Sequence, residues 1–159
     1  MKQYELTTIS EVLKNMGELE LAIGELYQTC GQLWPEHKEF WMDMEKAEFR
    51  HANNIDRMNQ IISERSENFE LGRSFSPIAI KTYLSGIKTN IQRLKQKDSS
   101  EINALFLARD IEQSYLESKY IEITKTEDKE FKSLTREIFS DTVFHREYLD
   151  KKIRELTSA

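Results

Sequence analysis

The chain has 159 residues, of which 32% are charged and 38% are hydrophobic, with five glycines, two prolines and a formal net charge of −5. This composition favours long amphipathic helices over a sheet protein rich in turns, and the lack of a Lys/Arg block argues against nucleic acid as a partner. The single cysteine, Cys30, excludes an internal disulfide framework and any Cys-x-x-Cys metal site. No apolar run has the length of a signal peptide or a membrane span, so we expect one soluble, cytoplasmic domain over residues 1–159, with no membrane partner.

The first predicted helix covers about residues 8–33. It begins at the capping box Thr8-x-x-Glu11 and ends before Pro35. One face of this helix is apolar apart from Glu20. The apolar positions on that face are Leu6, Leu13, Met16, Ile23, Tyr27, Cys30 and Trp34. An inward carboxylate destabilises a fold by several kcal/mol unless another group compensates its charge, so Glu20 is a candidate metal ligand.

The second predicted helix covers about residues 35–66 and packs antiparallel to the first because the link between them is short. Glu48 and His51 lie one turn apart in the middle of its apolar face. The other positions on that face are His37, Trp41, Met44, Ile55, Met58 and Ile62. A metal ion would compensate the Glu-x-x-His pair, whereas a surface pair on a misplaced helical face is the alternative. His37, at the start of this helix, is expected to be exposed.

Residues 68–76 form the clearest break in the pattern, and three further helices follow it. Ser76-Pro77 supplies a cap and a first-position proline for a helix that ends near residues 95–98, which we interpret as a crossover helix. The fourth helix covers about residues 100–125 and the fifth about residues 127–156.

The last two helices repeat the inward pattern of the first two. Glu112 lies on the apolar face of the fourth helix, and Asp141 and His145 lie on that of the fifth. Glu112 has an alternative interpretation as an exposed neighbour of Arg109, and Asp141 with His145 could form a hydrogen-bonded pair without metal. The complete candidate ligand set is Glu20, Glu48, His51, Glu112, Asp141 and His145.

The chain resembles the rubrerythrin-like branch of the ferritin-like superfamily. The residues that show this are Glu20 with Tyr27, Trp34-Pro35-Glu36, and Glu48-Phe49-Arg50-His51-Ala52. The resemblance implies an all-α, ferritin-like four-helix bundle with an additional crossover helix, holding two irons between carboxylates and histidines. It also implies that Tyr27 hydrogen-bonds near the metal as a candidate catalytic residue, although a tyrosine at such a position is also explained by core packing.

The second half departs from the family pattern. Thr142 stands three residues before His145, where the family has Glu, and Asp141 is the nearest acid. The rubredoxin-like module of true rubrerythrins is absent, because the chain has no Cys-x-x-Cys. We therefore expect the first-half ligands to hold metal more tightly than those of the second half.

Four inward acids and two neutral imidazoles would be balanced by two divalent ions, and such a ligand set suits iron or manganese, with zinc as a competitor. The implied function is non-haem di-iron oxidation of Fe(II), or reduction of peroxide or oxygen, with electrons from an external donor. The alternative is a bundle with a degenerate metal site that acts as a structural or interaction module, including one that recognises partner helices. Leu19, Leu26 and Leu33 are expected to form an exposed second apolar face, which would favour a homodimer.

Overall fold

The structure is a computed structural model that describes residues 1–158, apart from the side chains of residues 116–118, 120 and 121. Its described part contains five α-helices: α1 (Gln3–Leu33), α2 (Lys38–Glu64), α3 (Pro77–Lys95), α4 (Glu101–Ser118) and α5 (Lys129–Thr157). Two short strands join them, β1 (Phe69–Leu71) and β2 (Thr124–Thr126), with 3-10 turns at Pro35–His37, Ser66–Asn68 and Tyr120–Ile123. The predicted all-α class is confirmed.

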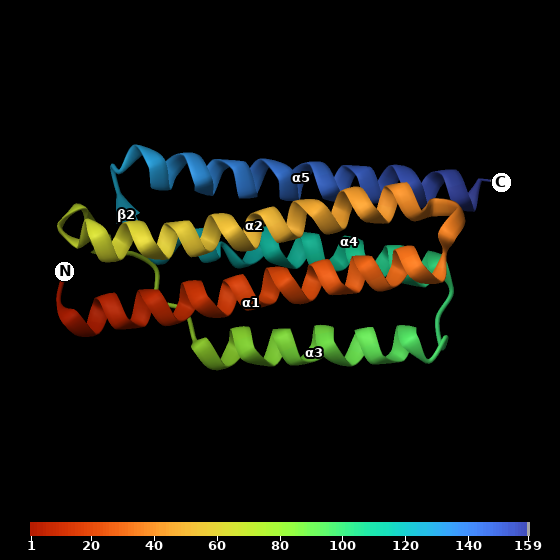
Figure 1. Ribbon diagram of the computed structural model, residues 1–159, viewed down its shortest axis with the longest axis horizontal. Helices are drawn as coiled ribbons and strands as arrows, with labels where there is room; N and C mark the ends of the chain where they lie inside the picture. Colours follow the sequence, from red (N-terminus) through yellow and green to blue (C-terminus); the bar gives the residue numbers. More distant parts are fainter. Residues whose placement is uncertain (159) are drawn as a thin grey trace.

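Four long helices lie side by side, and the fifth covers one of them (Figure 1). α1 packs against α2, and α5 packs against α2 and α4. α1 and α5 run in one direction, whereas α2 and α4 run in the other (Figure 1). This order is possible because α3 returns the chain from one end of the molecule to the other along the outside of α1. α3 therefore has the crossover position that the sequence predicted.

Side-chain caps fix the start of three helices. Ser76 accepts a hydrogen bond from the Ala79 amide at the start of α3, and Ser100 caps α4 in the same way. Asp128 accepts from the Phe131 amide at the start of α5. These caps agree with the predicted starts of the three helices to within two residues.

Two predicted helix boundaries are wrong. α1 begins at Gln3, because the Glu5 carboxylate accepts a hydrogen bond from the Lys2 amide and stabilises an earlier start than Thr8. α4 ends at Ser118, well before residue 125, because Lys119 adopts a left-handed conformation with φ of 54°. The residues that follow form a 3-10 turn and β2 instead of a continued helix.

The two strands pair in antiparallel register and join the α2–α3 connection to the α4–α5 connection. Gly72 is required directly after β1, because its amide donates to the Ile123 carbonyl and a Cβ at this position would overlap the Glu122 carbonyl oxygen. The sequence analysis predicted neither strand.

The hydrophobic core extends along the whole bundle and includes the face of α1 that α3 covers. Leu19 and Leu26 are fully buried, so the prediction of an exposed apolar face through them is wrong. Cys30 is a buried free thiol, as predicted. Among the described residues, no helix combines the length and the apolar composition that crossing a membrane requires.

Candidate metal centre

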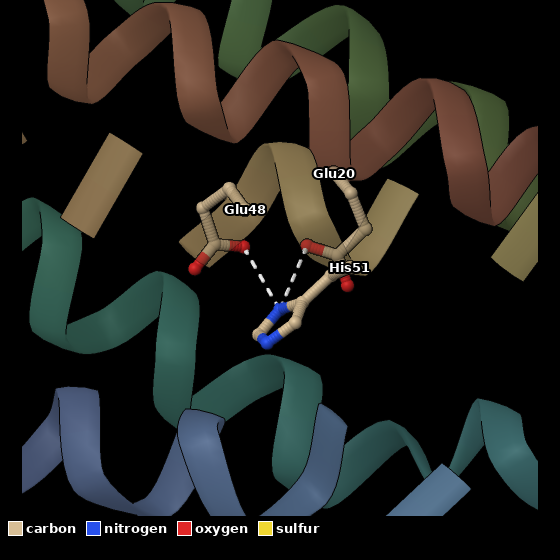
Figure 2. A group of neighbouring side chains, drawn as sticks. All are labelled: Glu20, Glu48 and His51. Carbon is tan, nitrogen blue, oxygen red and sulfur yellow. Dashed lines mark ion pairs between the residues drawn. The ribbon is translucent and has the colours of Figure 1, made fainter. Parts of the chain in front are cut away.

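Glu20, Glu48 and His51 meet in the middle of the bundle, between α1 and α2. Nδ1 of His51 lies 3.6 Å from a Glu48 carboxylate oxygen and 4.0 Å from a Glu20 carboxylate oxygen. Figure 2 shows both carboxylates directed at the same ring nitrogen. The i, i+3 spacing of Glu48 and His51 on α2 and the inward position of Glu20 on α1 produce this arrangement, as the sequence predicted.

Glu112 on α4 and His145 on α5 approach the same centre from the opposite side. Nδ1 of His145 lies 3.0 Å from the second carboxylate oxygen of Glu48 and 3.6 Å from a Glu112 oxygen. Two groups of three residues therefore offer ligand atoms within 4.8 Å of one another, and Glu48 belongs to both. The two imidazole rings lie 5.9 Å apart, centroid to centroid. A shared carboxylate between two such groups is the arrangement expected of a bridging ligand.

Several of the converging atoms lack a hydrogen-bond partner although they are buried. They are one carboxylate oxygen of Glu20, the Glu48 oxygen that faces His145, and Nδ1 of both histidines. The Glu48–His145 pair is close enough for a hydrogen bond, but its angles do not allow one. Buried polar atoms are almost always paired, so unpaired atoms on four candidate ligands favour a missing electrophilic partner. All five residues are at most 4% exposed, so bulk water does not supply that partner.

Asp141 lies outside the two groups. Its carboxylate is 3.0 Å from Nε2 of His51, the ring nitrogen that faces away from Glu20 and Glu48, and 2.6 Å from a guanidinium nitrogen of Arg50. A histidine that ligates a metal usually donates its other ring N–H to a carboxylate, so this position suits a residue that orients His51. The structure thus brings five of the six predicted ligands together and places Asp141 behind one of them.

Thr142 occupies the inward position that the acid of the family pattern would take. It is buried, and its hydroxyl donates to the Ile138 carbonyl one turn earlier on α5. The i+3 and i+4 neighbours of Ile138 on a helix differ by about 100° in direction, and here the helix turns Thr142 rather than Asp141 inward. The second group therefore contains one histidine and two carboxylates, with no contribution from Thr142.

Two tyrosines border the centre. The Tyr27 hydroxyl donates a hydrogen bond to Glu112, one of the candidate ligands. The Tyr115 hydroxyl lies beside Glu20, and its pKa is raised, first by burial and then by that carboxylate. The sequence analysis did not single out Tyr115. Its position one turn after Glu112 on the same helical face was the available signal.

Without metal, several candidate ligands have pKa values above their usual range, which favours their protonated forms. Burial, and then the nearby Glu48 carboxylate, raise the pKa of Glu20 well above its usual range, and the same two causes raise that of Glu112. Burial lowers the pKa of His145, but Glu112 and Glu48 outweigh this effect and raise it to about 10. Burial also opposes ionisation of Glu48, but its contacts with Glu20 and both histidines hold its pKa below the usual range. Protons therefore hold positions that cations could take.

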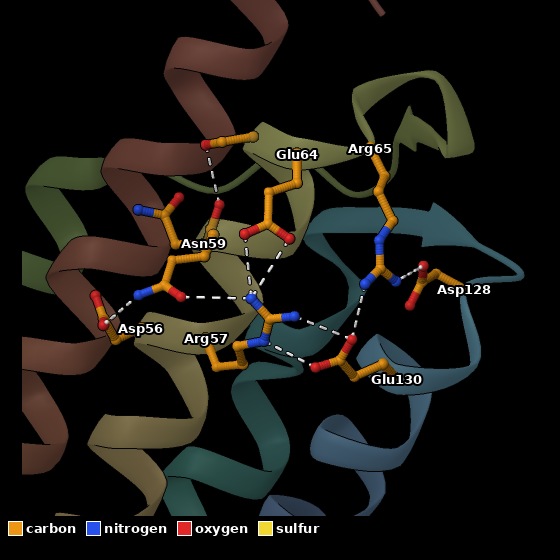
Figure 3. A network of polar contacts seen from close by, with 9 residues as sticks. Asp56, Arg57, Asn59, Glu64, Arg65, Asp128 and Glu130 are labelled. Atoms are coloured by element: carbon orange, nitrogen blue, oxygen red, sulfur yellow. Dashed lines mark hydrogen bonds and ion pairs between the residues drawn. The ribbon is translucent and has the colours of Figure 1, made fainter.

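A different cluster of acids lies between the end of α2 and the start of α5, and it is fully compensated. Arg65 contacts Asp128 at 2.9 Å and Glu130 at 3.0 Å, and Arg57 contacts Glu130 at 2.8 Å (Figure 3). These guanidinium groups satisfy the carboxylates without an added ion. The cluster is therefore a structural ion-pair network rather than a candidate ligand site.

A third group with ligand spacing lies at the opposite end of the bundle, where α1 meets α2. It consists of Glu36, His37 and Glu101, and it is partly exposed. His37 is not fully exposed as predicted, because Nδ1 of its ring lies 2.8 Å from a Glu101 oxygen. Glu101 also accepts a hydrogen bond from the Trp41 indole at 3.1 Å. The protein's own groups thus satisfy this carboxylate.

Comparisons of this chain with protein-family models, with curated proteins and with solved structures found no match.

Proposed function

We propose that this chain is a ferritin-like bundle that binds two metal ions, iron foremost, and uses them in oxidation of Fe(II) or reduction of peroxide or oxygen. The observation that carries the proposal is the pair of buried ligand groups that share Glu48 and leave their facing atoms unpaired. Three buried carboxylates without a neighbouring Lys or Arg would be strongly unfavourable in a permanent metal-free state. Two divalent cations would supply the missing charge.

The residues present fit a two-ion site of mixed oxygen and nitrogen ligands. Glu20 and His51 would hold one ion, Glu112 and His145 would hold the other, and Glu48 would bridge them. This donor set suits iron or manganese, and zinc can compete for it. Bound iron would supply redox chemistry at the centre of the bundle.

The surrounding residues of this chain position those ligands. Asp141 orients His51 by accepting from its outer ring nitrogen, and Arg50 holds Asp141 in place. The Tyr27 hydroxyl holds Glu112 through its hydrogen bond. The buried surroundings exclude bulk water from the centre. Carboxylate ligands also suit redox chemistry because they change between terminal and bridging modes as the charge of the ions changes.

A second candidate function rests on Thr142. Because this buried side chain offers no carboxylate, the second group is poorer in acids than the family pattern, which favours a bundle with one ion or with a degenerate structural site. The two functions differ in metal stoichiometry and in redox activity, and both are measurable on the purified protein.

The test is metal analysis after anaerobic loading with Fe(II), followed by addition of peroxide. We expect up to two iron ions per chain, loss of both in Glu48→Gln, and consumption of peroxide with oxidation of the bound iron. Parallel loading with Mn(II) and Zn(II) ranks the metals. Absence of any bound transition metal would overturn the proposal, and bound metal without peroxide consumption would favour the degenerate structural site.

A further inference from the structure

Three aromatic rings connect the candidate metal centre with the end of the bundle where α1 meets α2. The Tyr27 and Trp41 ring centroids are 5.9 Å apart, and the Trp41 and Trp34 centroids are 6.5 Å apart. Tyr27 and Trp41 are fully buried, whereas Trp34 is only partly buried and packs against the core. The series therefore begins at a ring hydrogen-bonded to the candidate ligand Glu112 and ends at a partly buried ring.

The two inner rings each donate a hydrogen bond to a carboxylate. The Tyr27 hydroxyl donates to Glu112, and the Trp41 indole N–H donates to Glu101 at 3.1 Å. Phenols and indoles become strong acids when they lose an electron, so a nearby proton acceptor makes their oxidation easier.

We propose that Tyr27, Trp41 and Trp34 form the electron-transfer path between the candidate metal centre and a one-electron reductant that docks at Trp34. The path rests on the proposed function, because it needs a redox centre at its inner end. The ring spacings allow each transfer to occur between neighbouring side chains in near contact.

Each step balances in electrons and protons. Tyr27 gives one electron to the oxidised centre and its phenol proton to Glu112. Trp41 then gives one electron to Tyr27, the phenol proton returns, and the indole proton passes to Glu101. Trp34 reduces Trp41, which recovers its proton, and the external reductant reduces Trp34. The net change is loss of one electron by the reductant and gain of one electron by the centre.

A branch of the aromatic cluster provides a matched control. Phe40 packs edge-on against Trp41 with centroids 5.1 Å apart, and Tyr148 packs on Phe40 at 4.6 Å. A phenylalanine ring is not oxidised under the conditions that oxidise tyrosine or tryptophan, so this branch does not continue the path. Tyr148→Phe removes an oxidisable ring of the same aromatic cluster without interrupting Tyr27, Trp41 and Trp34.

The experiment uses photogenerated tris(bipyridine)ruthenium(III), a one-electron oxidant, as the probe. On metal-free protein, the oxidant removes an electron at the surface, and the resulting tyrosyl radical is followed by transient absorbance and by electron paramagnetic resonance. The Tyr27 contribution is the signal that Tyr27→Phe removes. We expect Trp41→Phe and Trp34→Phe each to lose most of this contribution, and Tyr148→Phe to retain it.

The same flash is then applied to protein loaded anaerobically with Fe(II). The Tyr27 radical should decay faster than in metal-free protein, with one Fe(III) formed for each electron removed, and the two tryptophan variants should lose this Fe(III). An unchanged Tyr27 radical in both folded tryptophan variants overturns the path and leaves the metal proposal intact. Failure of the wild type to bind Fe(II) overturns the proposed function and with it the role of the path. Trp34→Phe keeps the test decisive if the core variant Trp41→Phe fails to fold.

Discussion

The charge of clustered carboxylates is compensated in different ways in the middle and at the end of the α2–α5 interface. At the end, Asp128 and Glu130 are paired with Arg57 and Arg65 at distances of 2.8 to 3.0 Å (Figure 3). In the middle, three buried carboxylates meet two histidines. Figure 2 shows Glu20, Glu48 and His51 of this group. Arg50, which lies near that site, is occupied by Asp141 and Glu137 at its rim.

This difference shows which acids the fold neutralises by itself. At the end, the Glu130 side chain is partly exposed and the Asp128 side chain is largely buried, but both have arginine partners, so these acids need no added cation. The acids in the middle are buried, and burial raises the pKa of Glu20 and Glu112, so metal ions compete with protons for these groups. Substitutions in the middle of the interface should therefore change metal binding strongly, and substitutions at its end should hardly change it. The following predictions test this contrast.

The largest effect is expected from Glu48→Gln, because Glu48 contributes to both ligand groups. An amide of the same shape removes the bridging charge without leaving a cavity. The variant should lose both iron ions, whereas His51→Ala and His145→Ala should each lose mainly one. His51→Ala should be the more damaging of the two, because Asp141 orients His51. Elemental analysis after anaerobic loading measures this, with the exposed neighbour Asp43→Asn as control; equal iron in Glu48→Gln and wild type would contradict the shared-ligand assignment.

The sequence predicted most of the candidate ligands but not the position of Asp141. Helical periodicity placed Glu20, Glu48 and Glu112 on inward faces, because burial of an apolar face fixes the rotation of a long helix. It failed for Asp141, because Asp141 and Thr142 are adjacent on the edge of that face and only packing against α2 decides which one points inward. The Asp141–His51 contact also joins residues 90 positions apart, which no local pattern reveals.

Helix ends and strands were less predictable for a related reason. Thr8 and Glu11 form a plausible cap, yet Glu5 caps the chain earlier, because the competing signals differ by only about 1 kcal/mol. β1 and β2 have three residues each and depend on pairing with one another across more than fifty positions. Neither segment is long enough to show a strand periodicity in the sequence.

The second prediction concerns pH. Burial lowers the pKa of His145, but Glu112 and Glu48 raise it to about 10 from an ordinary value of 6.5, so both ring nitrogens of His145 hold protons at neutral pH. Burial also raises the pKa of Glu20, which favours its protonated form. Metal must displace these protons, and its affinity should rise by about tenfold per pH unit for each proton displaced. Titrations of Zn(II), which avoids oxidation, from pH 6 to pH 8 measure this together with proton release. An affinity independent of pH would show that the centre is not protonated.

The metal-free protein should respond to pH in the opposite direction. A group whose pKa is raised on folding stabilises the folded state fully below its unfolded pKa and loses that contribution as pH rises through its folded pKa. For His145 this window runs from 6.5 to about 10, and raised carboxyl pKa values act with the same sign from 4.5 upward. The melting temperature with chelator should therefore fall as pH rises from neutral.

The third prediction compares melting with Fe(II) and with chelator, without oxygen. Metal that binds only the folded state stabilises it by about 2.7 kcal/mol at a hundredfold excess over the dissociation constant. Glu20→Gln should reduce this gain and leave the metal-free protein as stable as wild type or more so, because it removes a buried carboxyl that favours its protonated form. If chelator leaves the wild-type melting point unchanged and the variant melts lower, Glu20 is a structural residue.

The fourth prediction tests the positioning role of Asp141. Asp141→Ala removes the acceptor of the outer His51 nitrogen and should weaken the ion held by Glu20 and His51 by about 10- to 100-fold, as is typical for such orienting residues. Asp141→Asn keeps an acceptor and should have a smaller effect. Glu137→Ala is the matched control, because Glu137 also pairs with Arg50 but does not contact His51. A loss as large in Glu137→Ala would assign the effect to Arg50.

The smallest effect is expected at the end of the interface. Arg65→Met keeps the aliphatic length of the side chain but removes its ion pairs with Asp128 and Glu130, both of which retain other partners. Because Arg65 and Glu130 are exposed, solvent and salt screen their attraction. The variant should melt slightly below wild type in about 0.01 M salt and match it in about 1 M salt, since the screening length falls from about 30 Å to about 3 Å. Its iron content and its Fe(II)-dependent gain in melting temperature should equal those of wild type. A loss of iron in Arg65→Met would show that the end and the middle of the interface are coupled, and that the ion-pair network helps to set the spacing of the ligands on α2 and α5.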